Sequence, residues 1–265
     1  MRRLAACGWR ALEFSDEHWR ELDAREDPEQ HFRAMRTLFD DLGLHVPQMH
    51  GPMFNVCGPP EEVRPNMELA RRAVRWAGVL GIERYVFHPG SSPWAEEEAA
   101  WARVREQNAQ HIGSLAECGR EGGVKIAVEN TCDGPSKGRR EFGAIPAELL
   151  WIVRHTDAQR VGICWDTGHA CIQQLDQAQA LAALGPHLIA THVQDNDGRS
   201  DQHLLPFEGT IDWANLMGGL RAIGWEGLFN LEVPGAFGRV PLPAREAKLR
   251  YALELTEALV EGRVP

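Results

Sequence analysis

The chain has 265 residues, of which 43% are hydrophobic and 25% are charged, and its formal charge at pH 7 is −10. This composition is typical of a globular protein with a sizeable core and excludes a disordered or fibrous chain. The acidic balance gives no general field that attracts nucleic acid, so nucleic acid is not an expected partner. No run of about 18 apolar residues and no signal-peptide pattern is present, so we expect a cytoplasmic protein without a membrane span.

Seven short apolar runs predict β-strands in chain order, at residues 11–14, 45–50, 84–89, 124–130, 160–167, 187–195 and 227–233. A glycine followed by a large apolar residue precedes five of them, and these glycines are Gly8, Gly43, Gly81, Gly123 and Gly224. Glycine is favoured just past a helix end because it adopts the left-handed conformation without a steric penalty. Helical periodicity before Gly81 supports this reading, and the chain therefore alternates helices and strands.

The repeat predicts a single domain over residues 1–265 with a (β/α)8 TIM-type barrel. Counting back one repeat from Glu13 places a strand end before residue 1. We therefore predict a barrel that lacks the first β-strand at the N-terminus, with no inner strand in residues 1–7. Either the barrel is open there, or the start of the chain has lost that strand, or a partner segment closes the gap. The gap should be narrowed by direct pairing, filled by side chains, or covered by another segment.

Six cysteines show no CxxC pair and no regular spacing, which argues against a zinc knuckle or a disulfide framework. We expect reduced, mostly buried thiols.

Each predicted strand closes on a polar residue, and in order these are Glu13, His50, His88, Glu129, Asp166, His192 and Glu232. The carboxyl ends of barrel strands converge on one face, so these side chains should be neighbours. Like charges at such short range require a cation between them. The set Glu129, Asp166, His192 and Glu232 offers three carboxylates and one imidazole, which suits Mn²⁺, Mg²⁺, Co²⁺ or a catalytic Zn²⁺. Glu13 is the weakest member because it stands beside the missing unit.

Other polar residues have two readings. In "CWDTGHA" (164–170), Asp166 either caps the next helix, with His169 in its first turn, or belongs to the site. Asp201 and His203 point to one side of an extended segment and either bind a second cation or a sugar hydroxyl, or belong to a polar surface loop. A basic cluster could hold a sugar phosphate, and it comprises Lys137, Arg139 and Arg140.

The motifs "MHGP", "FHPG", "VEN", "CWDTGHA", "HVQDNDGRSDQHLLPFEGTIDW" and "LEV" resemble those of the xylose-isomerase-like barrel superfamily, from residue 5 onward. That superfamily joins sugar and sugar-phosphate isomerases and epimerases with endonuclease IV-type DNA repair enzymes. The resemblance to its ketose 3-epimerases implies one divalent cation on Glu129, Asp166, His192 and Glu232. It also implies that Glu129 and Glu232 act as acid and base, and that His169 contacts the substrate.

The resemblance to endonuclease IV-type enzymes implies a different site, with up to three Zn²⁺ ions and nine ligands. Compatible residues are present at all nine places, namely His50, His88, Glu129, Asp166, His169, His192, Asp201, His203 and Glu232.

Three functions follow as expectations. The first is a metal-dependent isomerase or epimerase of a sugar or sugar phosphate, which transfers a proton through a metal-stabilised enediolate. In it Glu129 and Glu232 are catalytic, and the residues that bind substrate or a second metal are His50, His88, His169, Asp201 and His203. The second is a multi-zinc phosphodiesterase acting at abasic DNA. The third is a non-catalytic barrel subunit, and a homo-oligomer is compatible with all three.

Overall fold

The computed structural model describes residues 1–92, 98–133 and 141–264. One sheet of six parallel strands forms the interior, and its neighbours follow the order of the chain. The strands are β1 (Ala11–Phe14), β2 (His45–His50), β3 (Arg84–Phe87), β4 (Lys125–Glu129), β5 (Val161–Asp166) and β6 (Leu188–His192). The basic cluster Lys137, Arg139 and Arg140 lies outside the described residues.

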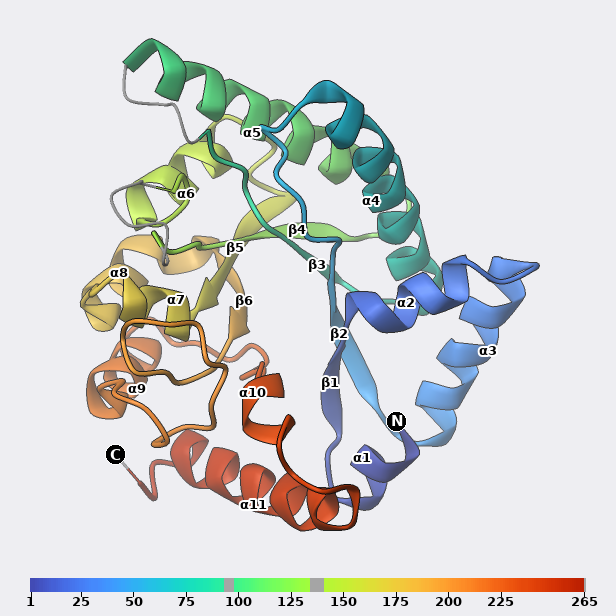
Figure 1. The fold of residues 1–265 in the computed structure, drawn as a ribbon, viewed down its shortest axis with the longest axis vertical. Coiled ribbons are helices and arrows are strands. Elements are labelled where there is room, and N and C mark those ends of the chain that lie inside the picture. Colours follow the sequence, from blue (N-terminus) through green and yellow to red (C-terminus); the bar gives the residue numbers. More distant parts are fainter. Residues whose placement is uncertain (93–97, 134–140, 265) are drawn as a thin grey trace.

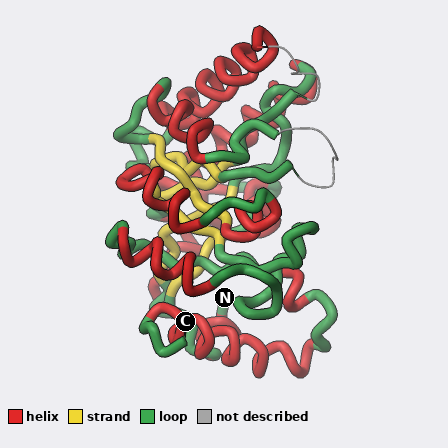
Figure 2. Tube along the Cα trace, turned by 90° about the vertical axis from the view of Figure 1, so that its left-hand side faces the viewer, coloured by secondary structure: helices red, strands yellow, loops and turns green. Residues whose placement is uncertain are grey.

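Helices surround this sheet (Figure 1), and the tube view places the strands inside the helical layer (Figure 2). They are α1 (Arg2–Ala6), α2 (Asp16–Asp23), α3 (Pro28–Asp41), α4 (Pro60–Leu80), α5 (Glu98–Cys118), α6 (Pro146–Arg154), α7 (Thr167–Ile172), α8 (Gln177–Leu184), α9 (Trp213–Ala222), α10 (Pro234–Phe237) and α11 (Leu242–Val260). The predicted barrel class is confirmed as a partial (β/α)8 barrel. Within the described residues, no helix has the length and hydropathy that a membrane span requires.

The five glycines predicted to end helices all have positive φ, between 60° and 106°. At Gly81, for example, φ is 76° and the amide donates back to the last turn of α4. Glycine is the residue that reaches this conformation at low cost. None of the six cysteines, all of which lie in the described residues, forms a disulfide. Only Cys7 and Cys164 are buried and the other four are partly buried, so the expectation of mostly buried thiols is wrong.

The alternation of side chains along each strand explains where the site lies. Tyr85 and Phe87 on β3 belong to the large core beneath the helices, whereas Val86 packs inside the sheet with Ala127, Cys164 and Ala190. Side chains two residues apart share a face of a strand. The next residues on this inner face are therefore the strand-end residues, namely His88, Glu129, Asp166 and His192.

The seventh predicted strand, residues 227–233, is wrong as a regular strand. The segment pairs with the chain after β6 through a single bridge between Val193 and Leu231. Two backbone hydrogen bonds hold it, from Val193 N to Asn230 O at 2.7 Å and from Glu232 N to Val193 O at 3.0 Å. The segment therefore pairs on one side only, with the chain directly after β6, and over this short stretch.

Residues 1–7 contribute no inner strand, as predicted, because α1 occupies them. A cavity of about 610 Å³ lies between β1 and residues 228–233. Side chains of α10 and α11 also line it, including Phe237, Leu249 and Leu253, and the Trp9 indole donates to Leu249 O at 3.2 Å. The third predicted outcome is therefore the one observed, because α10 and α11 cover the gap. The cavity lies beneath these two helices.

Asp195 organises the long segment that follows β6. Its buried carboxylate accepts hydrogen bonds from Gly209 N at 3.0 Å, Ile211 N at 3.1 Å and the Trp213 indole at 3.1 Å. The backbone of Asp195 also exchanges two hydrogen bonds of 2.9 Å with Leu204. Several donors aimed at one carboxylate stabilise its buried charge. Asp195 therefore fixes the segment that carries Asp201 and His203.

We predict that Asp195→Asn lowers the free energy of unfolding by about 1–3 kcal/mol, because the amide has one acceptor oxygen and turns its own donors toward buried donors. Urea denaturation measures the change. The matched control is Asp212→Asn, since exposed Asp212 caps α9 through Asn215 N at 3.0 Å and asparagine caps equally well. Equal stability of the two variants would contradict the role given to Asp195.

Candidate metal centre

The four predicted metal ligands meet at the carboxyl ends of the strands. One ligand atom from each of Glu129, Asp166, His192 and Glu232 lies within 4.8 Å of every other. Nδ1 of His192 is 3.1 Å from Oε2 of Glu129 and 3.2 Å from Oε2 of Glu232. The Glu129, Asp166 and His192 side chains are buried, whereas Glu232 comes from the irregular segment and is 26% exposed.

Unpaired buried atoms mark the centre of this group. Among the described residues, buried side-chain atoms without a hydrogen-bond partner include Oε2 of Glu129, Oδ2 of Asp166 and Nδ1 of His192. A buried polar atom that makes no hydrogen bond costs free energy, even where, as for Oε2 of Glu129 and Nδ1 of His192, an opposite charge lies 3.1 Å away. A divalent cation is the partner that accepts carboxylate and imidazole lone pairs together. The residues present therefore fit such an ion.

The pKa values of the group show how strongly its members interact. Burial raises the pKa of Asp166, and the charges of Glu129 and Glu232 add to this, so that the pKa reaches about 7. For Glu232, burial also raises the pKa, but nearby His192 outweighs it and brings the pKa to about 2. Burial lowers the pKa of His192, yet the surrounding acidic groups raise it well above its ordinary value. A cation would have to compete with protons for these groups.

The helix-cap reading of Asp166 in "CWDTGHA" is confirmed, and its role as a metal ligand stays a prediction. Its Oδ1 accepts the His169 amide at 2.5 Å and caps α7, while Oδ2 is left unpaired toward the centre. Asn130, which the sequence reading passed over, holds this strand end from the side: its Oδ1 accepts Asp166 N at 2.6 Å, and its Nδ2 donates to Asp166 O at 2.9 Å. Its position directly after Glu129 in "VEN" was the available signal.

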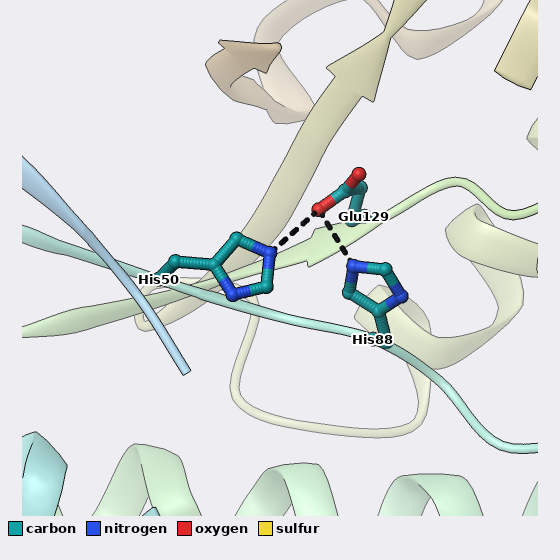
Figure 3. A group of neighbouring side chains, drawn as sticks. All are labelled: His50, His88 and Glu129. Atoms are coloured by element: carbon teal, nitrogen blue, oxygen red, sulfur yellow. Dashed lines mark ion pairs between the residues drawn. The ribbon is translucent and has the colours of Figure 1, made fainter. Parts of the chain in front are cut away.

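His50 and His88 approach the same glutamate from β2 and from the end of β3 (Figure 3). Nε2 of His88 lies 3.1 Å and Nε2 of His50 lies 3.6 Å from Oε2 of Glu129. The three residues form a second group whose atoms could hold an ion. Burial lowers the pKa of His50, but Glu129 outweighs this and raises it to about 9.

Asp201, His169 and His203 form a third cluster beside the centre. Oδ2 of Asp201 lies 2.9 Å from Nε2 of His203 and 3.4 Å from Nε2 of His169. Gln194 donates to the other oxygen of Asp201, a contact that the sequence reading did not anticipate. All nine residues named from the two resemblances therefore lie in one connected cluster.

Three of these imidazoles are oriented in the same way. Nδ1 of His50 lies 2.7 Å from Gly51 O, Nδ1 of His169 lies 2.8 Å from Asn130 O, and Nδ1 of His203 lies 3.0 Å from Glu232 O. A carbonyl oxygen only accepts, so Nδ1 carries the hydrogen in each case. When such an imidazole is neutral, Nε2 keeps its lone pair and can bind a metal ion.

Parallel strands ringed by helices, with a polar cluster at the carboxyl ends, define a TIM-barrel protein with a candidate metal centre. The chain belongs to the family of xylose isomerase-like TIM barrels, whose model matches residues 1–259.

Three individual proteins show what this chain is similar to. An uncharacterised protein of Methanocaldococcus jannaschii is 30% identical over 69% of this chain and 63% of its own length, so the chain spans less than two thirds of that relative. A probable endonuclease 4 of Acholeplasma laidlawii is 26% identical over 84% of this chain and 75% of its own length. The crystal structure of a D-tagatose 3-epimerase-like protein superposes with a TM-score of 0.75 at 24% identity, covering 96% of this chain and 91% of that one, which shows the shared fold.

We predict that Mn²⁺ raises the melting temperature of chelator-treated protein. At a Mn²⁺ concentration 100 times the dissociation constant, the free energy of unfolding should increase by about 2.7 kcal/mol. The affinity should increase from pH 6 to pH 8, because Asp166, with a pKa of about 7, and the imidazoles must lose protons to bind. Thermal denaturation and calorimetry measure both effects. Glu129→Ala should abolish the shift, whereas Glu117→Ala, an exposed glutamate on α5, should retain it. A wild-type melting temperature that no divalent cation changes would rule out the centre.

Proposed function

We propose that the protein is a divalent-metal-dependent isomerase or epimerase of a small sugar, which moves a proton at the carbon next to a carbonyl group. The observation that carries the proposal is the placing of two glutamates around one centre. Oε2 of Glu129 and Oε2 of Glu232 approach the same atom, Nδ1 of His192, at 3.1 Å and 3.2 Å. Two carboxylates so placed can serve one reacting carbon, one as base and the other as acid.

Glu129, Asp166, His192 and Glu232 would hold the cation. When bound, it would supply the positive charge that stabilises the developing enediolate. Glu129 is held rigidly on β4 and is 1% exposed, whereas Glu232 borders the cavity. The depressed pKa values of both glutamates keep them ionised at neutral pH, so either can accept the proton. His169 and His88 line the same cluster and would orient substrate hydroxyl groups.

The charges around the cavity favour an uncharged substrate. Two basic side chains, Arg10 and His50, are among the described lining residues. They are outnumbered by the carboxylates, which are Glu13, Asp16, Glu17, Glu232 and Glu257. This surface would repel a phosphate group and a DNA backbone. We therefore propose a neutral ketose or aldose rather than its phosphate. The D-tagatose 3-epimerase-like structure shares the fold on which this proposal is built.

We predict that Glu129→Gln and Glu232→Gln each lower turnover by about 10²–10⁴-fold, because each removes one proton-transfer group. A solvent-deuterium exchange screen over ketoses and aldoses finds the substrate, and NMR follows incorporation at the reacting carbon. Cation content is measured for each variant, so that loss of the metal is separated from loss of the base. Glu257→Gln, on the cavity wall, is the matched control and should keep wild-type turnover. Wild-type turnover in both site variants would refute the mechanism.

A second candidate is a multi-zinc phosphodiesterase acting at abasic DNA. The observation in its favour is that nine compatible ligands are assembled, with three imidazoles turned by Nδ1 hydrogen bonds so that Nε2 faces a carboxylate. The relationship to a probable endonuclease 4 agrees with it. A non-catalytic barrel subunit has only the missing strand in its favour.

Metal count separates these functions. We predict about one tightly bound cation per chain by elemental analysis, and unchanged cation content in His203→Ala, because His203 belongs to the third cluster and not to the central four. About three zinc ions per chain, falling in His203→Ala, together with cleavage of an abasic-site duplex, would establish the phosphodiesterase instead. A protein that binds no cation after supplementation would contradict both metal-dependent functions and favour the non-catalytic subunit over them.

A further inference from the structure

Glu13 reaches the outer face of the metal-centre histidine. It lies on β1, beside the missing unit, and its Oε2 is 2.9 Å from Nε2 of His192. The other ring nitrogen of His192, Nδ1, makes no hydrogen bond and faces Glu129 at 3.1 Å and Glu232 at 3.2 Å. The ring therefore connects Glu13 on one side to the candidate centre on the other. Among the described residues, Glu13 stands outside all four groups whose atoms could share an ion.

A second side chain fixes Glu13 in this position. The amide nitrogen of Gln48, on β2, donates to the same Oε2 of Glu13 and lies 3.4 Å from Thr191 O. Gln48 is fully buried, and the Glu13 side chain is 10% exposed. Gln48 presents donors to Glu13, so Oε2 acts as the acceptor toward both neighbours. Gln48 of β2 and His192 of β6 thus both contact Oε2 of Glu13, which lies on β1.

We infer that Glu13 is a positioning residue for the metal centre, an inference that rests on the proposed metal site. By accepting the Nε2 hydrogen of neutral His192, the carboxylate selects the tautomer whose Nδ1 lone pair faces the ion. It also holds the ring plane and increases the basicity of Nδ1. Carboxylates that contact a ligating histidine in this way typically contribute 10–100-fold to metal affinity.

The test is Mn²⁺ binding to chelator-treated protein by calorimetry, without substrate. Glu13→Gln keeps the size of the side chain but loses the charge, and its amide can donate to Nε2 and so favour the wrong tautomer. We expect the dissociation constant to rise 10–100-fold. Glu17→Gln makes the same charge change on an exposed residue of the same cavity wall and should bind as wild type does. This control separates the contact from the general loss of a negative charge.

A second variant covers the case in which Glu13→Gln does not fold. Glu13→Asp keeps the charge but has a shorter side chain, which no longer reaches Nε2 of His192. The Mn²⁺ dissociation constant of this variant should also rise 10–100-fold. ¹⁵N NMR of the Mg²⁺-loaded protein reads the tautomer of His192 directly, with Nε2 protonated in wild type and an altered pattern in the variants.

The outcomes are distinguishable. If wild-type protein binds no Mn²⁺, the proposed metal site and function fail. If wild type binds but the Glu13 variants match Glu17→Gln in affinity and keep the wild-type His192 spectrum, the metal site stands and the role of Glu13 is overturned.

Discussion

The structure depends on the burial of several carboxylates around one point. Glu129 and Asp166 are brought together because parallel strands of a barrel end on one face and every second side chain points inward, and Glu232 joins them from the irregular segment that pairs with the chain after β6. Their mutual repulsion is opposed by His192 in their midst and by imidazoles at the rim. Three atoms of this group still make no hydrogen bond within the described chain. The fold therefore gathers more negative charge at this point than the neighbouring imidazoles compensate.

Much of this arrangement could be predicted from the sequence because it follows from periodicity. Helix-ending glycines, short apolar runs and a polar residue at each strand end are local signals, and a parallel topology converts them into one cluster. The irregular course of residues 228–232 could not be predicted in this way. Its residues have strand composition, but in the structure they make a single bridge to the chain after β6, and no local pattern in the sequence indicates this.

The residues that hold the site in place through hydrogen bonds could not be predicted from the sequence, for a related reason. Asn130, Asp195 and Gln48 act through hydrogen bonds to strands or loops far away in the chain. A polar residue inside an apolar run gives no indication of which distant group it will meet. The geometry of neighbouring strands decides this, and it becomes visible only once the register is known. Asp166 shows the limit most clearly, because its two oxygens separately satisfy the helix cap and the centre.

The missing strand makes the two proposed catalytic glutamates unequal. Glu129 lies on β4 between two paired neighbours and is 1% exposed, whereas Glu232 lies on a segment paired on one side only and is 26% exposed. The cavity of about 610 Å³ opens beside Glu232, Glu13 and His50 and does not include Glu129 in its lining. Under the proposed function, a substrate that entered through this cavity would meet Glu232 before Glu129. Of the two carboxylates, the less constrained one is therefore the one that faces the cavity beside the gap in the barrel.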